Sequence, residues 1–135
     1  MPISFALDAA RRIITATVQG ELTFSDMRDY IDAVSAHGPL AGGDWIEVLD
    51  LGGATVVDLS FNAIHELRQQ RVALPAPGIV ATTIHAPSPL TYGISRILQA
   101  LQENEGHQTL IARDGIELAR DIENLLKSRA RQANC

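Results

Sequence analysis

The sequence has little cysteine, few aromatic residues and no excess of positive charge, and these shortages exclude several classes of protein. Its single cysteine, Cys135, is the last of 135 residues, so one chain cannot form a disulfide framework or a multi-cysteine metal site. Eleven basic residues against 16 acidic ones give a formal net charge of -5, which argues against a nucleic-acid or anionic-membrane surface. No segment approaches the ~18 apolar residues of a membrane helix. We therefore expect a cytoplasmic protein without membrane insertion and without nucleic-acid partners.

Two hydrophobic periodicities alternate along the chain. Runs rich in β-branched residues predict five strands, over residues 3–8, 13–19, 45–49, 79–84 and 107–113. Helical spacing predicts four helices, which begin near Thr23, Ser60, Ser88 and Asp114. The order ββαβαβαβα indicates a single α/β domain over residues 1–126, with a five-stranded, mostly parallel mixed sheet that opens with an antiparallel hairpin. Residues 127–135 form a polar tail that is expected to fray.

The segment from Trp45 to Leu49 is apolar on both faces, which is typical of a central strand in a parallel sheet. We expect the chain to leave this strand at Asp50 and to turn at Gly52-Gly53 with positive φ. Ligands and partners of open α/β sheets meet the loops at the carboxyl ends of such strands. The predicted regulatory or partner-binding edge comprises Asp50, Asp58, Ser60 and His85.

The four histidines do not have the spacing of a metal site. No two of them stand at an i, i+4 or HxH spacing, and each falls in a different element (His37, His65, His85 and His107). His85 ends a central strand, but no nucleophile is placed beside it by sequence spacing, so a surface or hydrogen-bonded histidine is the simpler interpretation. The sequence also lacks GxxxxGK and GxGxxG. We therefore expect no catalytic residue, metal ion or cofactor, and interpret the protein as non-enzymatic.

The third and fourth predicted helices carry apolar residues at helical intervals. Leu90 and Ile116 belong to these sets, and we expect both to face the sheet. Gly93 is unusual, because glycine inside a helix costs roughly 1 kcal/mol relative to alanine. A close contact between helices would explain it, so we expect a homodimer through this helix or through the antiparallel edge strand.

Three segments, LDLGGATVVDLS, SPLTYGISRILQAL and TLIARDGIELARDIENLL, resemble the STAS/CRAL-TRIO-type bacterial proteins. These share their fold with anti-anti-sigma factors and with the cytoplasmic domain of sulfate transporters. Anti-anti-sigma factors carry an Asp-Ser-Ser-Gly run whose second serine is phosphorylated by a partner kinase. The matching residues here are Asp58-Leu59-Ser60-Phe61, which keep the aspartate and the second serine but replace the first serine and the glycine.

The resemblance implies a regulatory or protein-interaction module that binds a protein partner and is switched by phosphorylation of Ser60. A plainer interpretation of Ser60 is a helix N-cap. The alternative function is a carrier of a small apolar ligand or lipid, which the CRAL-TRIO direction implies. An enclosed apolar pocket of at least ~300 Å³ would favour the carrier, whereas a shallow polar edge around Ser60 would favour the interaction module.

Overall fold

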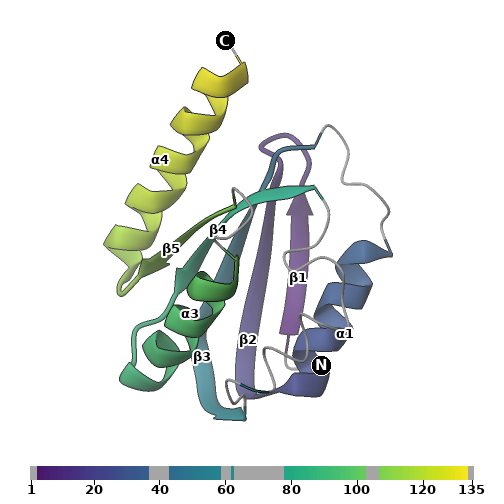
Figure 1. The fold of residues 1–135 in the computed structure, drawn as a ribbon, viewed down its shortest axis with the longest axis vertical. Coiled ribbons are helices and arrows are strands. Elements are labelled where there is room, and N and C mark those ends of the chain that lie inside the picture. The colour runs from purple at the N-terminus through teal and green to yellow at the C-terminus, as the bar shows by residue number, and fades with distance from the viewer. Residues whose placement is uncertain (1–2, 37–42, 59–61, 63–77, 103–106, 134–135) are drawn as a thin grey trace.

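A five-stranded sheet runs through the computed structural model, which describes residues 3–36, 43–58, 62, 78–102 and 107–133 (Figure 1). The strands lie side by side in chain order: β1 (Ile3–Asp8), β2 (Ile13–Thr23), β3 (Trp45–Asp58), β4 (Ile79–His85) and β5 (Gln108–Ala112). β1 pairs with β2 in the antiparallel direction, and all other neighbours are parallel. The predicted mixed sheet, its opening hairpin and the internal positions of β3 and β4 are therefore confirmed.

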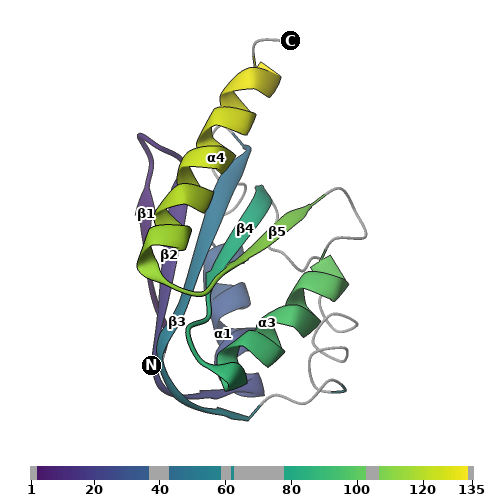
Figure 2. The same ribbon diagram turned by 90° about the vertical axis from the view of Figure 1, so that its left-hand side faces the viewer.

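Helices cover both faces of the sheet. The structure describes three: α1 (Phe24–Ser35), α3 (Pro89–Gln102) and α4 (Gly115–Ala133). α1 and α3 lie on one face, and α4 lies on the opposite face (Figure 2). The second predicted helix, over residues 60–72, lies outside the described residues except for residue 62, so three of the four expected helices are described. None of these three combines the length and apolar character needed to cross a membrane.

Side chains at the helix starts satisfy backbone N–H groups that have no partner within the helix. Thr23 and Asp26 form a reciprocal capping box at α1, in which each side chain accepts from the other residue's backbone N–H. The Asp114 carboxylate accepts from the Glu117 N–H at 2.8 Å at the start of α4. These predicted helix starts are confirmed.

The alternation of β3 divides its side chains between two cores. Trp45, Leu49 and Leu51 belong to the larger cluster, which packs beneath α1 and α3. Ile46 and Val48 point to the other face, into the smaller cluster that includes Leu125 of α4. Burial of both faces explains why this segment is apolar at successive positions.

Arg129 binds the C-terminal part of α4 to the residues that precede β2 and β3. Its guanidinium donates to the backbone carbonyls of Arg11 at 2.6 Å, Arg12 at 3.2 Å and Asp44 at 3.2 Å. The segment expected to fray from Lys127 is instead helical to Ala133. A side chain reaching back to distant carbonyls is invisible to periodicity, which explains the difference.

The predicted end of β3 is wrong. The strand does not stop at Asp50 but continues to Asp58, paired with β2. Gly52 and Gly53 do not form a turn, and neither is among the residues with positive φ. The run Asp-Leu-Gly-Gly resembles a turn locally, but its backbone is held extended by the neighbouring strand.

Candidate functional site

β3 contains a bulge next to the end of β4. Asp50 pairs with Thr17 of β2 and Gly53 pairs with Gln19, so three steps along β3 match two along β2. Such an extra residue interrupts the backbone ladder and re-aims nearby side chains. Here the Gly52 N–H donates to Oδ1 of Asp50 at 2.8 Å, so the aspartate side chain satisfies a backbone group at the bulge.

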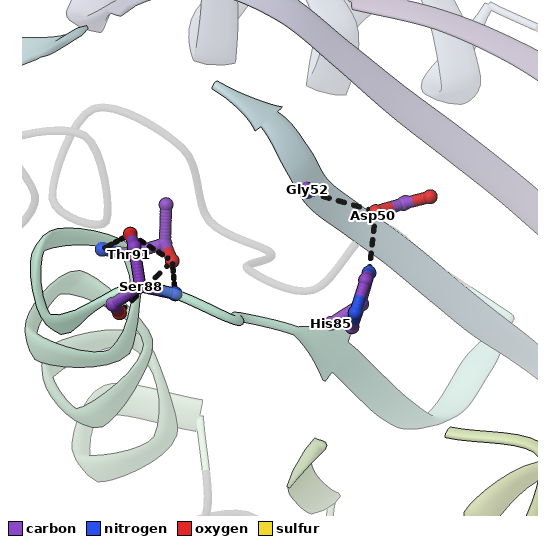
Figure 3. A network of polar contacts seen from close by, with 5 residues as sticks. All are labelled: Asp50, Gly52, His85, Ser88 and Thr91. Atoms are coloured by element: carbon purple, nitrogen blue, oxygen red, sulfur yellow. Dashed lines mark hydrogen bonds and ion pairs between the residues drawn. The ribbon is translucent and has the colours of Figure 1, made fainter. Parts of the chain in front are cut away.

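The same Asp50 oxygen holds a histidine of the neighbouring strand. Asp50 and His85 are register partners in β3 and β4, and Nδ1 of His85 lies 2.8 Å from Oδ1 of Asp50 (Figure 3). An ionised carboxylate can only accept, so Nδ1 carries the proton and Nε2 is the ring atom able to accept from a partner. The side chains are 19% exposed for His85 and 36% for Asp50, so the pair is reachable from solvent.

The glycine at position 52 makes room for this pair. A Cβ there would lie 3.0 Å from Oδ1 of Asp50 and 3.2 Å from both Nδ1 and Cε1 of His85. All three are side-chain atoms that can shift. The absence of a Cβ at position 52 therefore matters more for the Asp50–His85 contact than for the backbone.

Replacing Gly52 by alanine is therefore expected to separate Asp50 from His85 while the fold persists. We expect a destabilisation of about 1 kcal/mol, at the low end for overpacking, because side chains rather than backbone must move. Nitrogen-15 NMR of the neutral imidazole should show a loss of the Nδ1–H tautomer, as it should in Asp50→Ala, which removes the acceptor. An unchanged tautomer in Gly52→Ala would contradict this account.

The nearby hydroxyls are used for helix capping. Ser88 Oγ accepts from the Thr91 N–H at 3.1 Å and lies 2.8 Å from Thr91 Oγ1, which confirms the predicted cap of α3. Figure 3 shows this pair apart from the Asp50–His85 pair. Among the described residues, no hydrogen bond links His85 to a serine, threonine or cysteine side chain. The Asp50–His85 pair resembles a general base, but the described contacts place no nucleophile beside it.

Two apolar side chains lie exposed at the same end of the sheet. His85 and Ala112 are register partners in β4 and β5, and α3 and α4 begin just after them. Leu90, in the first turn of α3, is 47% exposed, and Ile116, in the first turn of α4, is 75% exposed. The prediction that both face the sheet is wrong, because both side chains are largely exposed to solvent. We call Asp50, His85, Leu90 and Ile116 the carboxyl edge.

The remaining predicted edge residues are placed differently. Asp58 is the last residue of β3 and pairs with Thr23 of β2, so it is separated from Asp50 along one strand that rises roughly 3.3 Å per residue. Ser60 lies outside the described residues. Gly93 is exposed, and no atom of the described residues lies within 4 Å of a Cβ built there, so the described part of the chain provides no close contact at this glycine.

A buried hydrogen-bond network connects α1 with β3, β4 and the start of β5. The sequence did not predict it. Tyr30 of α1 donates to Oε2 of Glu47 at 2.5 Å, and Thr82 donates to Oε1 of Glu47 at 2.9 Å. Thr82 Oγ1 also lies 2.9 Å from Nε2 of His107. A hydroxyl has one proton, so when Thr82 donates to Glu47 it must accept from Nε2–H of His107.

Burial shifts the pKa of every ionisable side chain in this hydrogen-bond network. It raises the pKa of Glu47, and the hydrogen bonds from Tyr30 and Thr82 offset part of that rise. The pKa of Tyr30 is raised well above its usual value by burial and then by the charge of Glu47. Burial lowers the pKa of His107, with a smaller opposing effect from the Ile79 backbone. Within the described residues, Nδ1 of His107 has no hydrogen-bond partner of good geometry.

Only one sequence signal could have pointed to this buried hydrogen-bond network: a glutamate in the middle of an apolar strand. Its partners come from α1, β4 and the start of β5, and local periodicity does not align these elements. His107 and His85 lie in separate networks, while His37 and His65 fall outside the described residues. The described part of the chain places no three His, Cys, Asp or Glu side chains together as metal ligands.

Comparisons with known proteins address the fold. No protein-family model matches the chain. No curated protein matches it either. Among solved structures, it is similar to the crystal structure of an uncharacterised DUF3478-family protein with a SpoIIAA-like fold from Shewanella loihica PV-4, with 14% sequence identity and a TM-score of 0.58. The match covers 92% of this chain and 93% of the other. The chain therefore has the SpoIIAA-like, or STAS-like, fold that its sequence resemblance implied.

Proposed function

We propose that this protein is a non-enzymatic interaction module that binds a protein partner at the carboxyl edge. The observation that carries the proposal is the pairing of exposed apolar side chains, Leu90 and Ile116, with the half-buried Asp50–His85 pair at one end of the sheet. Binding sites between proteins typically combine apolar anchors with a polar surround that fixes orientation.

The polar pair is suited to recognition because it is held in place before binding. The bulge directs Asp50 towards the Gly52 N–H and His85, and this fixes which imidazole nitrogen faces a partner. A fixed side chain loses less conformational entropy on binding than a mobile one.

Phosphorylation of Ser60 forms the regulatory part of the proposal. It rests on the matching Asp58 and Ser60 of the anti-anti-sigma motif. A phosphoryl group would add about -2 charge to a segment that follows β3, whose residues include Asp50 and Asp58. A homodimer through the Gly93 face of α3 is a further part of the proposal, and light scattering tests it.

The test is affinity capture from native extract with quantitative mass spectrometry, using wild type and the double variant Leu90→Ser/Ile116→Ser. Both side chains are exposed, so the variant is expected to fold normally and to lose at least tenfold of the captured partner. Leu7→Ser is the matched control. Leu7 is 39% exposed and is the next-to-last residue of β1, which runs antiparallel and so finishes at the opposite end of the sheet.

Equal loss in Leu7→Ser, or full retention in the double variant, would place binding elsewhere. Ser60→Asp compared with Ser60→Ala tests the phosphoswitch in the same assay.

Native mass spectrometry of the purified protein tests the carrier alternative. Two cavities lined by described residues, of about 270 and 220 Å³, both include charged side chains and do not favour it.

A further inference from the structure

A groove runs along the outer edge of β5. Its volume is about 270 Å³, and its walls come from α3, β5 and α4. Leu110 and Ile111 both line it, although successive strand residues point to opposite faces of the sheet. Leu110 packs against the smaller apolar cluster, on the α4 face, and Ile111 packs against the larger cluster, on the face covered by α1 and α3. A groove that includes both side chains must follow the edge of the strand rather than one face.

This edge has no neighbouring strand among the described residues. β5 is last in the order of the sheet, and Figure 2 shows it between α4 on one side and α3 on the other. The Gln99 side-chain amide donates to the Thr109 carbonyl at 2.9 Å, so the β5 backbone already accepts from a group outside the sheet. Edge strands present backbone donors and acceptors that another strand satisfies best.

The two walls of the groove carry opposite charges. On the α3 side lie Arg96 and Arg113, whose guanidinium stacks 4.6 Å from the centre of the Tyr92 ring. On the α4 side lie Glu117 and Asp121, four residues apart on one helix face, where like charges repel. Burial and then the Glu117 charge raise the pKa of Asp121, while a Thr83 hydrogen bond and the Arg120 charge offset part of that rise.

We propose that the β5 edge binds an extended segment of a partner protein in which basic and acidic residues alternate. Added as a sixth strand, such a segment directs alternate side chains to opposite faces. Its basic residues then meet Glu117 and Asp121, and its acidic residues meet Arg96 and Arg113. This docking surface shares no residue with the carboxyl edge, so different variants test the two proposals.

A second copy of this chain does not fit the same edge in antiparallel pairing. Antiparallel pairing of β5 with another β5 requires a two-fold axis perpendicular to the sheet, which keeps each face on its own side. The basic wall would then lie beside another basic wall, and the acidic wall beside another acidic wall. β5 itself, Gln108–Ala112, contributes no charged side chain to compensate.

The test uses nitrogen-15-labelled full-length protein and two blocked peptides of equal composition. Acetyl-VKEKEV-amide places both lysines on one face of a strand and both glutamates on the other, whereas acetyl-VKKEEV-amide mixes the charges on each face. We expect the first peptide to shift the amide signals of residues 108–113, to slow their hydrogen exchange and to bind at least tenfold more tightly than the second.

Charge reversal identifies the acidic wall. Glu117→Lys/Asp121→Lys should lose at least tenfold affinity for acetyl-VKEKEV-amide, while Glu123→Lys, an exposed position of α4 outside the groove lining, should bind as wild type does. Leu90→Ser/Ile116→Ser should also bind it normally, whatever the capture experiment shows. Equal affinity for the two peptides, no binding of either, or β5 signals that shift with protein concentration alone would overturn the proposal.

Discussion

Replacing Glu47 by leucine is expected to destabilise the protein by about 3 kcal/mol, because the change removes the carboxylate that accepts from two buried hydroxyls. Glu47 is 6% exposed, and its two oxygens accept from Tyr30 and Thr82. A buried hydroxyl that loses its partner retains its full desolvation penalty. Urea denaturation with linear extrapolation measures the change, and an unchanged slope confirms that only stability has changed.

A compensating variant separates lost hydrogen bonding from lost packing. In Tyr30→Phe/Glu47→Leu, the phenol that needed an acceptor is removed together with that acceptor. Replacing both partners by apolar groups is often nearly neutral, so we expect the double variant to recover about 1–2 kcal/mol of the loss. If the double variant is as unstable as the sum of its two single variants, the damage lies in packing instead.

The same glutamate should make stability depend on pH. Burial raises the folded-state pKa of Glu47 above its ordinary value of 4.5, so the folded protein holds this proton more tightly than the unfolded chain. Its contribution is fully present below 4.5 and is lost as pH rises through the folded-state pKa. The stability of wild type relative to Glu47→Gln should therefore fall as pH rises above 4.5. A difference that is constant with pH would show that Glu47 does not titrate as buried.

The pH dependence that His107 contributes to stability has the opposite sign. Its pKa is lowered below 6.5, so its contribution is present above 6.5 and is lost as pH falls through the folded-state value. The pH profile of the wild type combines both effects. Measuring Glu47→Gln in a His107→Gln background isolates the glutamate.

Local signals predicted the elements of the fold well because their causes are local. The helix starts at Thr23, Ser88 and Asp114 each depend on a side chain and a backbone amide three residues later, and all three are present. The order of strands and helices then restricts the sheet to a few topologies.

The features that the sequence did not predict depend on contacts between distant segments. The bulge of β3 is set by its pairing with β2, so Gly52-Gly53 resembled a turn. Asp50 and His85 were both assigned to the carboxyl edge, but their direct contact depends on the β3–β4 register across 35 positions. The partners of Glu47 are likewise fixed only when α1, β3 and β4 pack together.

Gly53→Ala is expected to cause the second large loss of stability, again because of a distant strand. A Cβ at this position would lie 2.6 Å from the backbone carbonyl oxygen of Val18 and 2.8 Å from Oε1 of Gln19. The glutamine side chain can move away, but the carbonyl belongs to β2 and moves only if β2 and β3 separate. We expect a destabilisation of about 3 kcal/mol, at the upper end for overpacking, which outweighs the usual gain from a stiffer unfolded chain.

Gly93→Ala provides a control of opposite sign within the same protein. Gly93 lies inside α3, and a Cβ there would meet no atom of the described residues within 4 Å, so alanine should stabilise the monomer by about 1 kcal/mol through helix propensity. At roughly 4 °C per kcal/mol for a chain of this size, scanning calorimetry should show Tm about 12 °C lower for Gly53→Ala and about 4 °C higher for Gly93→Ala. A Gly53→Ala protein as stable as wild type would mean that β2 and β3 are not held this closely together. The rise in Tm is expected for the monomer, so light scattering accompanies the calorimetry. In the homodimer proposed through the Gly93 face of α3, the added Cβ would instead weaken the contact and lower Tm.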